Sequence, residues 1–207
     1  MSQGTLFIIS APSGAGKSSL INALLNRFNV DNKIKLSVSH TTRQMRPGEE
    51  NHKSYHFVSV DEFLELISKN SFYEYAKVFD NYYGTSRESV EQWLGEGYDV
   101  LLDIDWQGAR LIREQTKNTY SIFILPPSLE ELERRLINRG QDSEEVIKNR
   151  MDKAKREISH YNEYDYLLIN DDFDETLSQL HAIIKAHRVK RENQESNHED
   201  LIKQLLS

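Results

Sequence analysis

The stretch Ile8-Ile9-Ser10-Ala11-Pro12-Ser13-Gly14-Ala15-Gly16-Lys17-Ser18-Ser19 decides the fold of this chain. An apolar run over residues 6–9 leads into it and predicts a buried parallel strand, since both faces of the run are apolar. Apolar residues then recur at helical spacing, at Leu20, Ile21, Leu24, Leu25 and Phe28. A strand, a loop of small residues and a helix, in that order, form the context that a phosphate-binding P-loop requires.

The backbone of this loop is suited to anions. Small residues let N–H groups turn inward as an anion nest, and the helix that starts near Gly16 adds its positive end. Lys17 is placed to reach the β- and γ-phosphates of a nucleotide, and Ser18 to bind Mg²⁺. The motif's first glycine is replaced by Ala11, which adopts a positive φ only at a cost. The alternative interpretation is a chance glycine-rich turn before a helix.

Length and composition limit the class of protein. The chain has 207 residues, no cysteine and a formal net charge of −7, which suits one domain with an insertion and excludes disulfides and thiolate metal sites. Neither a transmembrane run nor a signal peptide is expected, so a cytoplasmic enzyme is the simplest interpretation. Net acidity argues against a nucleic-acid binder.

Strand and helix patterns alternate through most of the chain, which predicts an α/β fold of the P-loop NTPase type, with a parallel sheet and helices on both faces. Strand patterns cluster in residues 41–85, which we interpret as an inserted α+β subdomain. The core is then expected over residues 1–40 and 86–190, with a helical lid near 128–160. Residues 191–207 are expected to be a polar tail that ends in a short amphipathic helix, which could fray or dock on a second subunit in a homo-oligomer.

A polar loop is expected over residues 40–53, because it has a Pro-Gly pair and no periodicity. Its Arg43 and Arg46 could bind a phosphate through forked, charge-assisted hydrogen bonds. With Glu49 and Glu50 nearby, the two arginines could equally form a solvated ion-pair surface.

Glu74 lies within the aromatic strand pattern of residues 72–79, where a carboxylate requires a partner. Residues 81–84 are interpreted as a turn. Thr85 and Glu88 have the spacing to cap the next helix, and that structural role competes with any role of Thr85 in ligand binding.

Another core strand ends in carboxylates at Asp103 and Asp105. An Asp that closes a strand beside a P-loop is in the usual place to organise Mg²⁺. It can also simply cap the helix that begins at Trp106.

Arginines gather in a helical region that Ser128 and Glu131 open with capping-box spacing. These arginines are Arg134, Arg135, Arg139 and Arg150. Glu130–Arg134 and Glu131–Arg135 are spaced as ordinary surface ion pairs, which gives the structural interpretation. The functional interpretation is a mobile lid that closes over phosphates, with residues 140–143 as its turn.

The sequence resembles the guanylate kinase family, and its bacterial members in particular, over residues 4–185. The resemblance rests on the P-loop together with five further motifs, which are Ser37-Val38-Ser39-His40-Thr41-Thr42-Arg43-Gln44-Met45-Arg46-Pro47-Gly48-Glu49, Tyr55-His56-Phe57, Tyr82-Tyr83-Gly84-Thr85, Leu102-Asp103-Ile104-Asp105-Trp106-Gln107-Gly108 and Asn170-Asp171-Asp172. One departure is His52, at a position where the family usually has glycine.

The resemblance implies transfer of the ATP γ-phosphoryl group to GMP or dGMP, with Mg²⁺ as cofactor. GMP would be held by Ser39, Arg43, Arg46, Glu49, Tyr55, Glu74, Tyr83, Thr85 and Asp105. ATP would be held by Ser13, Gly14, Ala15, Gly16, Lys17, Ser18, Ser19 and Asn170. Mg²⁺ would lie at Ser18 and, through water, at Asp103. The catalytic cations would be Lys17, Arg43, Arg135, Arg139 and Arg150.

Glu74 then acquires a role, because guanine presents N1–H and N2–H₂ side by side to a carboxylate and adenine lacks both donors. Two alternatives remain at this stage. One is a catalytically inactive guanylate-kinase-like module that binds peptides, and the other is a P-loop kinase for another nucleoside monophosphate.

Overall fold

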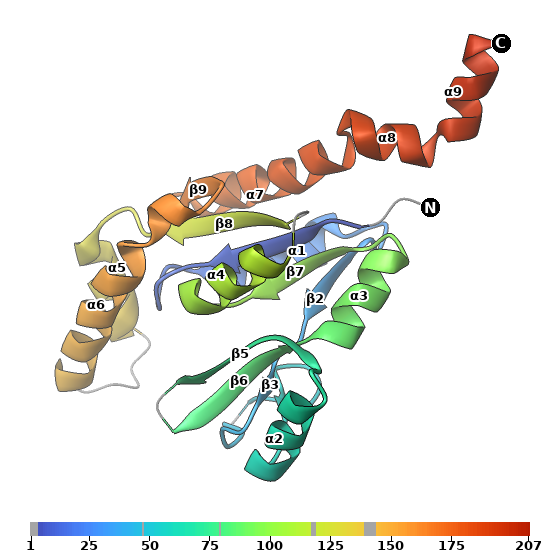
Figure 1. The fold of residues 1–207 in the computed structure, drawn as a ribbon. Coiled ribbons are helices and arrows are strands. Elements are labelled where there is room, and N and C mark those ends of the chain that lie inside the picture. Colours follow the sequence, from blue (N-terminus) through green and yellow to red (C-terminus); the bar gives the residue numbers. More distant parts are fainter. Residues whose placement is uncertain (1–3, 47, 79, 117–118, 139–143) are drawn as a thin grey trace.

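A computed structural model describes residues 4–46, 48–78, 80–116, 119–138 and 144–207. Its central element is a parallel sheet in which the P-loop strand takes the middle position (Figure 1). In spatial order the strands are β2 (Ile34–Ser37), β7 (Asp99–Asp103), β1 (Leu6–Ser10), β8 (Thr119–Leu125) and β9 (Tyr166–Ile169). Adjacent strands pair in parallel throughout this sheet. The carboxyl ends of β1 and β7 therefore lie side by side, and they carry the P-loop and Asp103.

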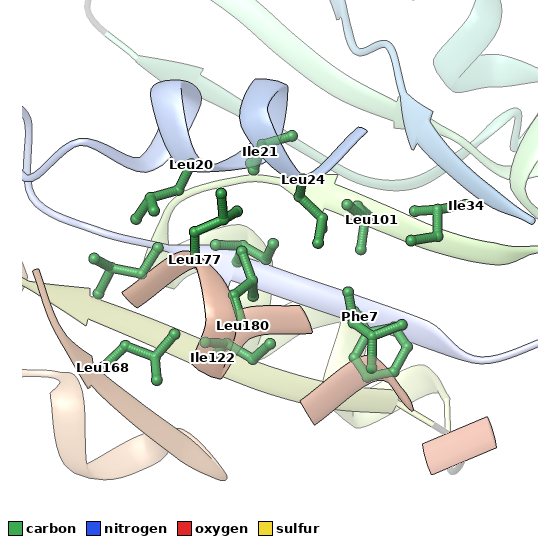
Figure 2. Close-up of a cluster of buried hydrophobic side chains, with 13 residues drawn as sticks. Phe7, Leu20, Ile21, Leu24, Ile34, Leu101, Ile122, Leu168, Leu177 and Leu180 are labelled. Carbon is green, nitrogen blue, oxygen red and sulfur yellow. The ribbon is translucent and has the colours of Figure 1, made fainter. Parts of the chain in front are cut away.

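Helices cover both faces of the central sheet, as the alternating pattern predicts. Helices α1 (Lys17–Phe28) and α7 (Phe173–Arg188) pack on one face, where they form a cluster with Phe7 and Ile9 of β1 (Figure 2). The opposite face of β1, with Leu6 and Ile8, packs with α3 (Arg87–Gly95) and α4 (Trp106–Gln115). Every second side chain of β1 enters the same cluster, which explains why the whole strand is apolar.

A second, smaller sheet lies apart from the first and has the strand order β4 (His56–Phe57), β3 (His40–Thr41), β6 (Asn81–Ser86) and β5 (Phe72–Val78) (Figure 1). Helix α2 (Val60–Ser68) belongs to this part of the chain and begins with a capping box formed by Ser59 and Glu62. The turn predicted at residues 81–84 is wrong, because these residues are part of β6. The hairpin reverses earlier, so that Val78 and Asn81 already pair across the strands.

Phe63 fixes α2 to the small sheet. Its side chain is fully buried, and its ring stacks on Phe72 of β5 and Tyr82 of β6, with centroid separations of 4.6 and 5.4 Å. We expect Phe63→Ala to lower the free energy of unfolding by roughly 3–5 kcal/mol, because it removes a large buried ring and leaves a cavity. Urea denaturation followed by circular dichroism measures this. Val60→Ala on the exposed side of the same helix is the control, and an equal loss in both variants would contradict this packing.

Two further helices, α5 (Leu129–Asn138) and α6 (Glu144–Ile158), lie at the end of the sheet toward which the β1 and β8 arrows point (Figure 1). They pack on each other through a small cluster of Leu132, Leu136 and Ala154. Arg139 and the predicted turn at residues 140–143 lie outside the described residues. The segment predicted to be a helical lid corresponds, in the described part of the chain, to α5 and α6.

The tail extends beyond the end of α7 as two helices, α8 (Arg191–Asn197) and α9 (Glu199–Leu206) (Figure 1). The predicted amphipathic helix corresponds to α9. Helix α8 was not predicted, because its sequence is entirely polar and has no periodicity. Side chains attach it to the preceding helix, since Asn193 Nδ2 donates to His187 O at 2.8 Å and Gln194 Nε2 to Arg188 O at 3.0 Å. No helix in the described ranges is both long and apolar enough to cross a membrane.

Candidate active site

The P-loop connects β1 to α1 and depends on a glycine at the helix start. Gly16 is the N-cap of α1 and has a φ of 97°, a conformation that residues with a side chain adopt at a cost. A Cβ atom there would lie 2.4 Å from Asn170 Nδ2. The buried Asn170 in turn donates from Nδ2 to Ala15 O at 2.6 Å. Asn170 thus supports the backbone of the P-loop, and its contact with ATP stays a prediction.

The two departures from the family pattern have different consequences. Ala11 does not have a positive φ, so the missing glycine causes no strain there. His52 has a φ of 65°, which explains why glycine suits that position. His52 Nδ1 lies 2.8 Å from His56 Nδ1, and the His56 ring stacks on that of His40.

Lys17 lies at the start of α1 and forms an ion pair with Asp103 at the end of β7. Ser18 and Ser19 follow in the first turn of α1 and are exposed. The register of the sheet brings the carboxylate here, because Ile9 of β1 is paired with Asp103 of β7. The predicted strand-end carboxylate therefore faces the P-loop lysine.

A cavity of about 230 Å³ opens beside Lys17, between the central sheet and the small sheet. The predicted site residues that line it are Lys17, Ser39, Tyr55, Glu74, Tyr83, Asp103 and Asp105. Residues from distant parts of the sequence thus meet in one place. The cavity joins the P-loop to the second sheet, which is the arrangement that a two-substrate transfer requires.

Glu74 is a buried carboxylate in this cavity and is only 8% exposed. Thr85 Oγ1 donates to Glu74 Oε1 at 2.7 Å, so the prediction that Thr85 caps α3 is wrong. Ser86 is the residue that precedes α3. Burial, as the main cause, and the nearby Asp105, as a smaller one, together raise the pKa of Glu74 to about 7. Because burial disfavours the charged form of this carboxylate, a ligand that donates hydrogen bonds to it would stabilise that charged form.

Asp105 caps a helix, which is one of the two roles that its position in the sequence allows. It is the N-cap of α4, and its Oδ1 accepts a hydrogen bond from Gly108 N at 2.9 Å. A Cβ at Gly108 would lie 3.2 Å from Glu74 Cδ, so the glycine lets the start of α4 approach the cavity closely. Because Asp105 also lines the cavity, capping and ligand binding are compatible at this residue.

Arg43 and Glu49 form a double hydrogen bond in the loop that follows β3. The Nη1–Oε2 distance is 3.0 Å and the Nη2–Oε1 distance is 2.7 Å. This pair is not the solvated surface considered above, because the Arg43 side chain is only 13% exposed. The hydrogen bonds to Arg43 lower the pKa of Glu49, whose Oε2 also accepts from Arg46 N at 2.8 Å. The Arg46 side chain itself is exposed.

Two tyrosines border the same region. The Tyr55 ring lies under the Arg43 guanidinium at 5.5 Å and makes an edge contact with Tyr83, with centroids 6.1 Å apart. Burial raises the pKa of Tyr55, so its hydroxyl stays protonated and can donate a hydrogen bond. Arg43, Tyr55 and Tyr83 therefore lie close together, and their guanidinium and hydroxyl groups suit a phosphate group.

Three arginines of α5 and α6, namely Arg134, Arg135 and Arg150, donate to carboxylate, carbonyl or hydroxyl oxygens. Arg135 Nε donates to Glu131 Oε1 at 2.7 Å and Nη2 to Asn170 O at 3.1 Å. Arg134 pairs with Glu131 and not, as predicted, with Glu130, because one Glu131 carboxylate binds both arginines. For the same reason the capping box is only half formed, with Glu131 N donating to Ser128 Oγ at 3.1 Å.

Arg150 of α6 reaches the P-loop, where its Nη2 donates to Ser13 Oγ at 2.7 Å. Sequence reasoning missed a second contact at the same residue, in which Ser13 N donates to Glu157 Oε2 at 3.3 Å. The available signal was the spacing of seven residues, which places Arg150 and Glu157 on one helix face.

The fold and the site define a P-loop nucleotide phosphotransferase. A sequence model of the family described as "Guanylate kinase" matches residues 3–187. The chain belongs to the guanylate kinase family, which confirms the resemblance.

Individual relatives agree with the family assignment. A guanylate kinase of Photobacterium profundum is 60% identical, over 100% of this chain and 99% of the relative. A guanylate kinase of Escherichia coli is 59% identical over the full length of both chains. A crystal structure of guanylate kinase from Anaplasma phagocytophilum has a TM-score of 0.75 and 38% identity, covering 95% of this chain and 96% of the other.

Proposed function

We propose that this chain transfers the γ-phosphoryl group of Mg²⁺-bound ATP to GMP or dGMP, giving ADP and GDP. The observation that carries the proposal is the buried Glu74 carboxylate, which faces a cavity shared with the P-loop lysine. The family membership and the identity to the relatives above support the same activity.

Guanine recognition by Glu74 follows from hydrogen-bond chemistry. A carboxylate accepts two hydrogen bonds in parallel, and N1–H and N2–H₂ of guanine supply two adjacent donors. Thr85 already occupies one side of the group, at Oε1, and so fixes its orientation. Adenine would supply neither of these two donors to the buried charge, at a cost that corresponds to roughly 10⁴-fold discrimination.

The acceptor phosphate would lie between the small sheet and Lys17. Arg43 supplies a guanidinium that Glu49 already holds in position, and Tyr55 and Tyr83 supply hydroxyl groups. No general base is required, because the attacking phosphate oxygen is already ionised. Rate enhancement comes from alignment of the two phosphates and from positive charge around the transferred group, at Lys17, Arg135 and Arg150.

The donor set beside the P-loop fits Mg²⁺ better than a metal that requires an all-protein site. Among the described residues, no cluster of three or more histidine or acidic groups is placed to hold a metal ion. Mg²⁺ typically uses one or two protein ligands together with phosphates and water. The hydroxyl of Ser18 and, through water, the carboxylate of Asp103 suit that role. When bound, the cation neutralises charge on the phosphates.

The division of the chain follows from these roles. We assign residues 41–85 to acceptor binding, residues 1–40 and 86–190 to the P-loop core, and α5 and α6 to the lid. Closure of the lid would exclude water, which otherwise could take the phosphoryl group from ATP. Location in the cytoplasm, the absence of nucleic-acid binding and a homo-oligomeric state stay predictions.

Product analysis by anion-exchange chromatography tests the proposal. With ATP, GMP and Mg²⁺, we expect ADP and GDP to form in equal amounts, and a chelator to stop the reaction. ADP and GDP should regenerate ATP and GMP. Absence of turnover from folded protein would favour the inactive peptide-binding module instead.

Arg43→Lys tests the acceptor-phosphate pocket. A lysine cannot form the forked pair of hydrogen bonds, so we expect kcat/KM for GMP to fall roughly 10- to 100-fold while KM for ATP changes little. Steady-state kinetics with each substrate varied in turn measures this. Arg134→Lys removes a comparable forked pair on the exposed surface of α5 and serves as the control. Equal effects in the two variants would contradict the assignment.

A further inference from the structure

Helix α6 contacts the P-loop at a single residue through two side chains of opposite charge. Arg150 Nη2 donates to Ser13 Oγ at 2.7 Å, and Ser13 N donates to Glu157 Oε2 at 3.3 Å. Between them on the same helix face lies Ala154, which is fully buried against Leu132 and Leu136. The small alanine lets α6 pack closely on α5, and this packing holds the face with Glu157 toward the P-loop.

The Glu157 carboxylate thus accepts a hydrogen bond from a loop whose backbone N–H groups are suited to binding anions. Ser13 N belongs to the P-loop, whose backbone donors normally face nucleotide phosphates. Burial raises the pKa of Glu157, and Asp105 raises it further, while Lys153 and Lys17 lower it. The group therefore lies in the electric field that ATP would also experience. A carboxylate this close to the P-loop repels a polyanionic ligand.

We propose that Glu157 is a positioning residue that occupies the P-loop in place of phosphate before ATP binds. ATP has to displace the carboxylate from Ser13 N, and its phosphates then become the anion that the loop and the lid helix share. Arg150 is on the same face of α6 as Glu157. When phosphate replaces the Glu157 carboxylate at the P-loop, the position of this lid arginine therefore changes with it. This inference rests on the proposed use of ATP and adds a residue that sets its affinity.

Glu157→Gln provides the direct test. Glutamine keeps the size of the side chain and an oxygen acceptor for Ser13 N, but it removes the negative charge. We expect the Kd for Mg²⁺-bound ATP, measured by isothermal titration calorimetry without GMP, to fall roughly 3- to 10-fold, which is the scale of a single charge interaction near a protein surface. Binding of adenosine, which has no phosphate, should not change. In turnover, KM for ATP should fall while KM for GMP stays constant.

Asp152→Asn is the matched control, because it removes the same charge from an exposed position on the same helix. It should leave the Kd for ATP unchanged. Glu157→Ala is the second variant, and it should also tighten ATP binding. At lower pH, protonation of Glu157 should narrow the difference between Glu157→Gln and the unmodified chain.

Unchanged or weaker ATP binding in both Glu157 variants would overturn the proposal, as would an equal gain in Asp152→Asn. The calorimetry does not depend on phosphoryl transfer. If the unmodified chain failed to phosphorylate GMP while Glu157→Gln bound ATP more tightly, the proposed function would fail and this inference would stand.

Discussion

Lys17→Ala is expected to lower kcat about 10³-fold or more, with little change in the fold. Lys17 lies in the cavity wall at the junction of the P-loop and the acceptor region, where positive charge stabilises the transferred phosphoryl group. The substitution leaves Asp103 without its ion-pair partner. That carboxylate is 32% exposed, so water can solvate it and the loss of stability should be small. A coupled assay of ADP release measures kcat, and circular dichroism checks the fold.

Lys69→Ala is the control for this variant. Lys69 is an exposed lysine that pairs with Glu65 on α2, so its removal changes the net charge by the same amount without touching the P-loop. We expect it to retain full activity. An unchanged kcat in Lys17→Ala would mean that the P-loop assignment is wrong.

Glu74→Gln is expected to lower kcat/KM for GMP on the order of 10³-fold while KM for ATP changes little. The amide presents one acceptor and one donor to the two donors of guanine, so one hydrogen bond is lost and two donors oppose each other. Specificity should fall with it, because the discrimination against AMP rests on the same carboxylate. Comparison of kcat/KM for GMP and AMP in both proteins measures the effect.

The same substitution is expected to stabilise the ligand-free protein. Burial raises the pKa of Glu74 from 4.5 to about 7, so the folded state disfavours the charged form. This effect lowers the free energy of unfolding. The loss is absent below about pH 4.5, grows as the pH rises and is complete above about pH 7. It amounts to about 3 kcal/mol, at 1.36 kcal/mol for each pH unit. The difference in free energy of unfolding between Glu74→Gln and the unmodified chain should therefore increase from pH 4.5 to pH 8.

Glu65→Gln, an exposed carboxyl on α2, is the control for both measurements. It should change neither GMP specificity nor the pH dependence of stability. If Glu74→Gln were less stable than the unmodified chain at pH 8, the carboxylate would be stabilised by interactions in the ligand-free protein, and the expected penalty for its burial would be contradicted.

The central fold could be predicted because its signals are local. The apolar run of β1, the glycines of the loop and the periodicity of α1 occupy a continuous stretch, and each feature supports the next. The resemblance to the family then identified distant residues, such as Ser39 and Glu74, that periodicity alone could not bring together. The structure places these two residues on the wall of one cavity.

The errors arose where contacts across the fold override local preference. Residues 81–84 have the composition of a turn, yet pairing with β5 and β3 makes them a strand. Thr85 has capping spacing, yet the buried Glu74 takes its hydroxyl. The spacing of four residues pairs Glu131 with Arg135 alone, whereas in the structure Glu131 binds both Arg134 and Arg135. The spacing of residues along the chain does not predict any of these three sets of contacts.

The contact between Glu157 and Ser13 shows a different limit. The two residues are 144 positions apart. The seven-residue spacing of Arg150 and Glu157 places them on one face of α6, but it does not tell what that face contacts. Only the packing of α6 on α5 directs this carboxylate to the P-loop. Contacts of this kind require the three-dimensional structure.

The measurement that tests the account most directly is a coupled ADP-release assay with Mg²⁺ and ATP in which GMP, dGMP, AMP, CMP and UMP are offered separately. The buried Glu74 beside the P-loop predicts turnover with GMP and dGMP alone. Comparable turnover with AMP, CMP or UMP would leave the fold unchanged but contradict the guanine pocket, and no turnover with any of them would contradict the proposed kinase activity.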